Sequence, residues 1–130
     1  MKSKIIIDGR VRITADEISD DTLRLIKARI GLQAVKDYRD AYSLKKRTFK
    51  KFLKYKTMKQ RLPEEQKEYR RLKHIVTDCD NVMQEVEKFA MTAYGEDIFG
   101  FDGEHVVNAI RRKVKAEWMD RSLFKRLSED

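Results

Sequence analysis

Apolar residues recur every three or four positions along most of the chain, which is the spacing of one helix face. The first run carries Leu23, Ile26, Ile30, Ala34, Tyr38, Ala41, Phe49, Phe52 and Tyr55. It predicts a long basic helix over residues 15–60, with start signals at Thr14–Glu17, which has the form of a capping box, and at Asp20. Gly31 weakens this helix by about 1 kcal/mol relative to alanine, but allows a close helix crossing.

A second helical run follows the break at Leu62 and Pro63, because proline is tolerated in the first turn of a helix. Its apolar positions alternate by three and four: Leu72, Ile75, Cys79, Val82, Val86, Phe89 and Ala93. This heptad pattern predicts a helix over residues 63–94. We expect it to pack antiparallel on the first helix, or to form a coiled coil between chains.

The glycine-containing segment 95–103 is predicted to be a loop. Its Ile98, Phe99 and Phe101 are expected to plug the end of the bundle. Asp102 is expected to cap a final helix over residues 102–119, which an apolar spacing of four extends toward residue 127. The buried face of that helix is expected to hold Val106, Val107, Ile110, Val114 and Trp118.

The N-terminal residues 1–13 carry two β-branched runs around Asp8 and Gly9, which predicts a β-hairpin. A two-residue turn would place Ile7 opposite Arg10. The expected fold is therefore mainly α: a short N-terminal hairpin and a bundle of about three helices, two of them long and antiparallel. We expect one domain, and a homodimer formed through the hairpin or the Leu72–Ala93 stripe, because a lone hairpin is marginally stable.

Composition narrows the class of protein further. The 130 residues are 41% hydrophobic, and no stretch approaches the roughly 18 apolar residues of a membrane span. The single cysteine, Cys79, excludes an internal disulfide and fits a reducing compartment. The apolar run at Ile5–Ile7 is too short for a signal peptide. We therefore expect a cytoplasmic protein without a membrane partner.

Charge is distributed unevenly, although the total is +8. Residues 44–61 hold nine basic and no acidic residues, whereas residues 62–110 hold five basic and eleven acidic ones. On a helix, Lys46, Lys50 and Lys54 lie four apart and form one broad positive face. Such a face attracts phosphates without reading sequence. The predicted partner is therefore nucleic acid or a nucleoprotein complex.

The predicted nucleic-acid-binding residues are Lys45, Lys46, Arg47, Lys50, Lys51, Lys54, Lys59, Arg61, Arg111, Arg112 and Lys115. Two alternatives stay open: the basic block is neutralised by the acidic helix or a partner chain, or the Arg111–Lys115 cluster only complements a helix end. Phe49, Phe52 and Tyr55 could stack on bases, but their spacing favours core packing.

Candidate chemistry is sparse. His74 and Asp78 are spaced to share one helix face and supply half of a metal site, while Cys79 falls in the apolar stripe. Glu96, Asp97, Asp102 and Glu104 cluster around the glycines, in a spacing that fits no calcium loop. No phosphate-binding loop, dinucleotide motif or nucleophile elbow is present. We predict a non-enzymatic protein without a metal or cofactor.

The Ile13–Asp16 to Ile26 segment, the Ala34–Ala41 segment and Asp102–Glu104 resemble small proteins encoded in phages and prophages of Firmicutes. The chain departs from that layout in its long basic stretch at residues 44–61. The resemblance implies a bacterial cytoplasm and a phage or prophage accessory protein that binds nucleic acid. Two alternatives are an inhibitor of a host defence complex, similar to anti-CRISPR proteins and acting by protein–protein contact, and a structural or assembly adaptor.

Overall fold

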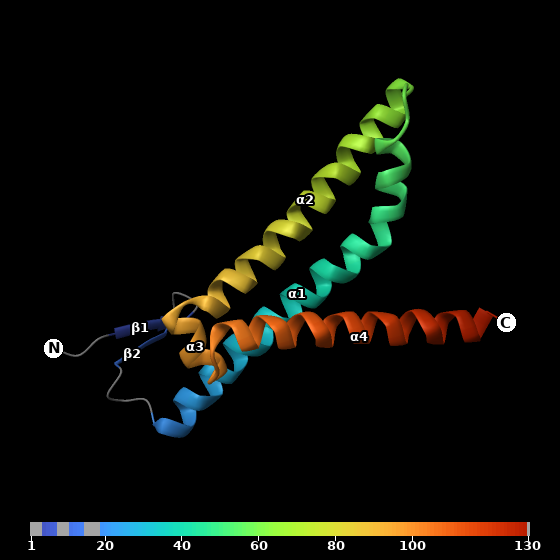
Figure 1. Ribbon diagram of the computed structural model, residues 1–130. Coiled ribbons are helices and arrows are strands. Elements are labelled where there is room, and N and C mark those ends of the chain that lie inside the picture. The colour runs from blue at the N-terminus through green and yellow to red at the C-terminus, as the bar shows by residue number, and fades with distance from the viewer. Residues whose placement is uncertain (1–3, 8–10, 15–18, 130) are drawn as a thin grey trace.

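The computed structural model describes residues 4–7, 11–14 and 19–129. Within them lie strands β1 (Lys4–Ile7) and β2 (Val11–Thr14) and helices α1 (Asp20–Lys56), α2 (Pro63–Met91), α3 (Ala93–Phe99) and α4 (Gly103–Glu129). The prediction of a mainly α protein is confirmed. In Figure 1, α1 and α2 form a helical hairpin, and α4 starts beside α3 at the open end of that hairpin, opposite the turn that joins α1 to α2.

β1 and β2 pair in antiparallel fashion, with Ile7 opposite Val11 and Ile6 opposite Arg12. This register corrects the two-residue turn, in which Ile7 would face Arg10. Three residues, 8–10, separate the paired ends and lie outside the described residues. Three isoleucines in a row offer an apolar side chain to either face, so the pattern alone did not determine the register.

Helix α1 begins at Asp20 rather than at residue 15, because Ser19 is extended and its side chain accepts the Thr22 N–H at 3.2 Å. Residues 15–18 of the predicted capping box lie outside the described residues. The helix ends at Lys56, four residues earlier than predicted. The Arg61 side chain accounts for this end: it donates to the carbonyls of Tyr55, at 2.7 Å, and Lys56, at 3.4 Å.

The apolar stripe of α2 divides into two rows. Leu72, Cys79 and Val86 are buried as expected, together with Val76 and Ala90. Ile75, Val82 and Phe89 are only half-buried and line a groove beside α1. The predicted antiparallel packing holds, but α2 also contacts α4, and in the core that includes α4 the buried position is Ala90 instead of Phe89.

Residues 93–99 form helix α3, where the end of the preceding helix at residue 94 and a loop from residue 95 were predicted. The Thr92 hydroxyl accepts the Gly95 N–H at 3.0 Å and so caps this helix. A Cβ on Gly95 would overlap the carbonyl oxygen of Phe89, and one on Gly103 would lie 2.6 Å from that of Ala90. These glycines therefore permit close packing of helix ends. Ile98 is buried as expected, whereas Phe101 is 63% exposed and plugs nothing.

Helix α4 runs past residue 119 to Glu129. The Gly103 N–H donates to the Glu96 side chain at 3.2 Å, and the Asp102 backbone carbonyl accepts the Val106 N–H at 3.0 Å. The start of α4 is therefore capped by the Glu96 carboxylate of α3, and not by the Asp102 side chain as expected. The expected apolar face is buried at Val106, Val107, Ile110 and Val114, and Trp118 is half-buried.

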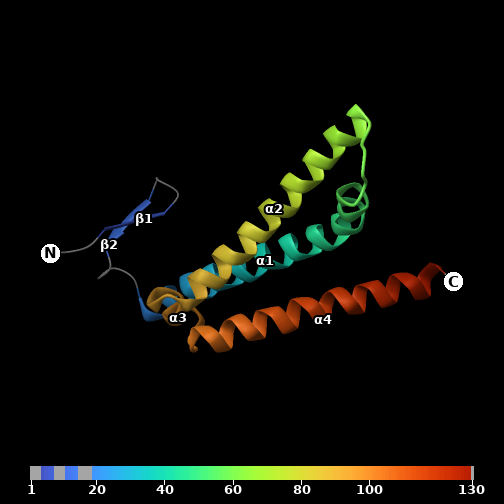
Figure 2. The same ribbon diagram turned by 45° about the horizontal axis from the view of Figure 1, so that its top comes forward.

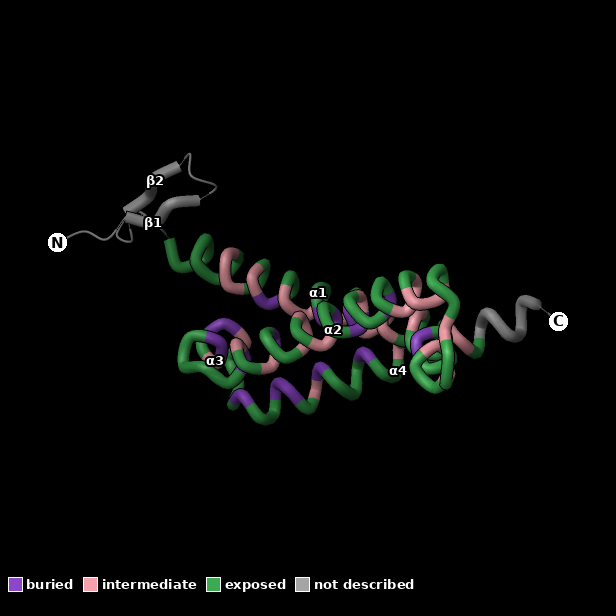
Figure 3. Tube along the Cα trace, turned by 90° about the horizontal axis from the view of Figure 1, so that it is seen from above, coloured by how far each residue is buried: buried purple, intermediate pink, exposed green. Residues whose placement is uncertain are grey.

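Two separate cores hold the helices. The base core joins α1, α2 and α4 and contains Tyr38, Val86, Ala90, Val106, Val107, Ile110 and Val114. The smaller tip core joins α1 and α2 through Phe52, Leu72 and Val76, with Tyr55 and Tyr69 packed against it. Buried positions recur along one side of α4 and gather at α3 (Figure 3). No helix among the described residues is long and apolar enough to cross a membrane.

Candidate nucleic-acid interface

The tip of the α1–α2 hairpin, defined here as residues 45–74, is the positive end of the molecule. It contains 13 lysine and arginine residues and three acidic ones, giving +10. Four of these cations, Lys67, Arg70, Arg71 and Lys73, come from α2 and were not among the predicted site residues. Sequence reading grouped them with the acidic residues further along α2, although the helical hairpin folds them back beside the basic block.

Within the tip, Lys45, Lys51 and Arg61 have structural partners. Lys45 forms an ion pair with Asp80 at 2.6 Å, and Lys51 lies 3.5 Å from Glu68. The Arg61 guanidinium caps α1 and lies 3.9 Å over the Tyr69 ring. Neutralisation by α2, one of the two alternatives from the sequence, therefore accounts for part of the basic block.

The outer stripe, defined as Lys46, Arg47, Lys50 and Lys54, is different. All four residues are exposed, and none forms an ion pair within the described part of the chain. Lys59, beyond the end of α1, is exposed as well. Like charges three and four positions apart repel each other along a helix, so this stripe weakens the helix that carries it. A phosphate backbone would relieve that repulsion.

Glu68 is held ionised by the cations around it. Its carboxylate accepts hydrogen bonds from Arg71 and lies near Lys51, which together lower its pKa to about 2. Glu68 thus stays negative and offsets the inner cations. Its ion pairs among the described residues are with Lys51 and Arg71.

The aromatic residues of the tip act mainly as core. Phe52 is 8% exposed, and its ring stacks on Tyr69 with 5.8 Å between centroids and 5° between planes. Tyr55 packs against the same core. Phe49 is 38% exposed, with the Lys45 ammonium 5.7 Å from its ring centroid. Phe52, Tyr55 and Tyr69 therefore pack the cationic helix against α2, and among these four tip rings Phe49 is the exposed one on which a base could stack.

The second predicted cluster is not brought to the tip. Arg111 donates two hydrogen bonds to Glu87, at 2.6 and 3.0 Å, in the half of α2 away from the tip. Arg112 and Lys115 are exposed on α4. Figures 1 and 2 show α4 diverging from the hairpin toward its C-terminal end. The cluster therefore belongs to another part of the surface.

The metal-ligating residue types are dispersed. His74 lies 3.2 Å from Asp78, but no group of three His, Cys, Asp or Glu side chains that could hold a metal is found among the described residues. Cys79 is 4% exposed, and burial, followed by the charges of Asp80 and Asp78, raises the pKa of its thiol. Its position fits the core residue expected from the stripe.

Its fold and its surface together define a mainly α protein whose helical hairpin has a cationic tip. Comparison with protein-family models, curated proteins and solved structures finds no match to the chain.

Proposed function

We propose that the tip binds the phosphate backbone of nucleic acid without reading its sequence, as part of a phage or prophage accessory protein. The observation that carries the proposal is the outer stripe: four exposed cations on one helix, with no acidic partner among the described residues. The stripe spans about 12 Å at 1.5 Å per residue. A duplex of that length carries about seven phosphate charges on its two strands.

Binding would proceed by exchange of condensed counterions for the lysine and arginine side chains. The inner cations Lys45, Lys51 and Arg61 are occupied by protein partners, so they are not part of the proposed contact. Lys59 and the cations on the outer side of α2 would widen it. The proposed contact is made to phosphates alone, because Phe52 is buried and Tyr55 and Tyr69 pack against the tip core.

The test is fluorescence-anisotropy titration of short single- and double-stranded DNA and RNA between 50 and 300 mM salt. If the stripe neutralises four phosphates, log K should fall with log salt at a slope of about −3.6 on duplex DNA. Changing Lys46, Arg47, Lys50 and Lys54 together to glutamine should remove most of this slope and weaken binding at low salt by a factor of 100 or more.

The matched control changes Arg29, Lys36, Lys88 and Lys113 to glutamine, which removes the same charge from exposed positions outside the tip. We expect it to retain most of the affinity. Equal loss in both variants would show that total charge, not the tip, drives association. Failure of the wild type to bind at 50 mM salt would overturn the proposal. The runner-up, protein–protein inhibition of a host defence complex, would then be tested first.

A further inference from the structure

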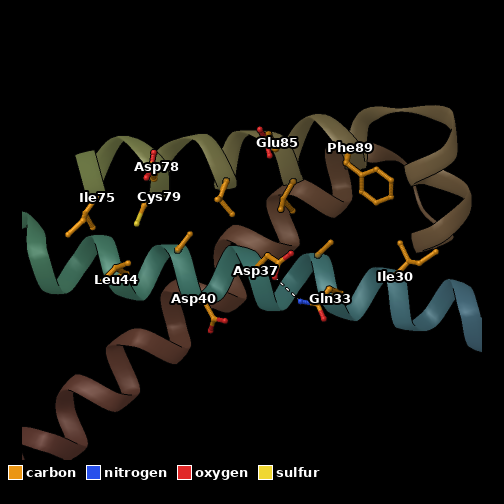
Figure 4. Close-up of a pocket in the computed structure, with 14 residues that line it drawn as sticks. Ile30, Gln33, Asp37, Asp40, Leu44, Ile75, Asp78, Cys79, Glu85 and Phe89 are labelled. Atoms are coloured by element: carbon orange, nitrogen blue, oxygen red, sulfur yellow. Dashed lines mark hydrogen bonds between the residues drawn. The ribbon is translucent and has the colours of Figure 1, made fainter. Parts of the chain in front are cut away.

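An open groove runs between α1 and α2 on the side of the hairpin away from α4. Its volume is about 750 Å³. Figure 4 shows Ile30 and Leu44 of α1 facing Ile75 and Phe89 of α2 across it, with α4 passing behind. The Arg39–Glu117 ion pair joins α1 to α4 on the opposite side of α1. The groove is thus an apolar seam that the chain's own helices leave uncovered.

The rim of the groove is acidic in a protein whose total charge is +8. Asp37 and Asp40 line it from α1, and Asp78 and Glu85 from α2, whereas none of the described lysines and arginines lines it. Asp37 accepts a hydrogen bond from Gln33 at 2.8 Å, and Asp78 lies near His74. Within the described residues, Asp40 and Glu85 have no cationic partner. A complementary occupant is a helix with apolar residues flanked by cations.

The same chain carries such a helix face. On α4, Arg112, Lys115, Met119 and Leu123 follow one another at spacings of three and four, which places them on one side of the helix. All four are exposed, Met119 by 60% and Leu123 by 57%. Val114, 1% exposed, lies on the opposite side of α4, against the core. The outer face of α4, as we call these four residues, therefore has no partner within the described chain.

The dimensions agree as well. Along α1 the groove extends from Ile30 to Leu44, or about 21 Å, and the outer face of α4 extends from Arg112 to Leu123, or about 17 Å. We propose that the outer face of α4 of one copy seats in the acidic groove of a second copy. Met119 and Leu123 then cover the apolar seam, while Arg112 and Lys115 meet the carboxylates of the rim. If two copies exchange this contact, the dimer is closed and two-fold symmetric.

Sedimentation velocity from 5 to 500 µM tests this association on nuclease-treated protein. Wild type should dimerise, and 500 mM salt should weaken the dimer, because the contact is partly ionic. Changing Met119 and Leu123 together to aspartate should raise the dissociation constant at least tenfold. The matched control places aspartate at Leu25 and Leu32, which are 61% and 70% exposed and do not line the groove. It should dimerise like wild type.

A charge exchange tests the pairing itself. One variant carries Asp40→Lys and Glu85→Lys, and the other carries Arg112→Glu and Lys115→Glu. All four positions are exposed, so both variants should keep the circular dichroism of wild type. Each alone should dimerise at least tenfold more weakly than wild type. Their mixture should form a heterodimer, because the reversed groove of one fits the reversed α4 of the other.

Three results would overturn the proposal: a wild type that stays monomeric at 500 µM, a dimer unaffected by the α4 aspartates, or a mixture that associates no better than its components. If the wild type stays monomeric, the next occupant to test for the groove is a basic helix from another protein. The outer-stripe glutamine variant should dimerise like wild type, so failure of nucleic-acid binding and failure of self-association are distinguishable.

Discussion

At the scale of single residues, Glu87 joins three helices. From α2, its carboxylate accepts the Tyr38 hydroxyl of α1 at 3.1 Å and two hydrogen bonds from Arg111 of α4. The Arg111 hydrogen bonds lower the pKa of Glu87, against the opposing effect of burial. Burial, followed by the charge of Glu87, raises the pKa of Tyr38. The hydrogen bonds of Glu87 thus link α1, α2 and α4 beside the apolar side chains of the base core.

This contact predicts an acid-sensitive stability. A carboxyl group whose folded pKa is lowered stabilises the fold above its unfolded pKa, near 4.5, and the stabilisation is lost as pH falls through the folded pKa. Glu87→Gln should lower the free energy of unfolding at pH 7 by about 1–2 kcal/mol, because a charge-assisted contact is replaced by a neutral one.

Urea unfolding at pH 7 and pH 3 measures the effect. The difference between wild type and Glu87→Gln should narrow at pH 3. Glu104→Gln, at an exposed position of α4 without an ion pair among the described residues, is the control and should differ little from wild type. If the difference in unfolding free energy between wild type and Glu87→Gln stayed constant with pH, the ionised Glu87 carboxylate would not be the source of the stabilisation.

At the scale of elements, the corner of α2, α3 and α4 depends on glycines that are needed for space. The Cα atoms of Gly95 and Gly103 lie against the backbone of residues 89–91 at the end of α2. Gly31, in the middle of α1, faces the Phe99 side chain, where an added Cβ would make an ordinary contact at 3.4 Å. The three positions therefore respond differently to the same added methyl group.

Gly95→Ala should destabilise the protein by about 1–3 kcal/mol, because the new Cβ must displace backbone. Gly31→Ala should be neutral or stabilising by up to about 1 kcal/mol, since alanine favours the helix and Phe99 can adjust. Thermal unfolding followed by circular dichroism compares the two. A Gly95→Ala variant that melts with wild type would show that α3 is held elsewhere.

The helices also show which parts of the fold could be predicted from the sequence. Three-and-four periodicity predicted the long helices, because burial on one face imposes that period on the chain. It failed at residues 93–99, where glycines needed for close packing resemble glycines of a loop. It also placed Phe89 on the buried face in place of Ala90, because nothing in the α2 sequence shows that α4 packs against this end of the helix. At the tip, the charge block was visible, but the role of Arg61 as a helix cap was not.

At the scale of the whole molecule, the two cores divide the hairpin into regions of different stability. The base core has contributions from three helices, whereas the tip core has only those of α1 and α2. Local stability follows the density of buried apolar contacts. The tip should therefore open without the base, although both belong to the same two long helices.

Hydrogen exchange tests this division with two matched truncations. Leu72→Ala, at a position 2% exposed in the tip core, should accelerate exchange in residues 50–76 and change residues 83–90 and 106–114 little. Val114→Ala, at a position 1% exposed in the base core, should accelerate exchange throughout. The expected cost of the leucine truncation is about 2–5 kcal/mol. Uniform acceleration by Leu72→Ala would mean that the hairpin is one cooperative unit.

The position of the tip at one end of a long hairpin also gives the molecule an electric orientation. The tip holds +10 in a chain of total charge +8, so the remaining residues are acidic by two. Positive charge gathered at one end produces a dipole moment along the hairpin, and a polyanion exerts a torque on such a dipole before contact. At low ionic strength the protein would therefore approach a polyanion tip first. Most productive encounters would then need no rotational search, and the base with its acidic groove would be left facing solvent.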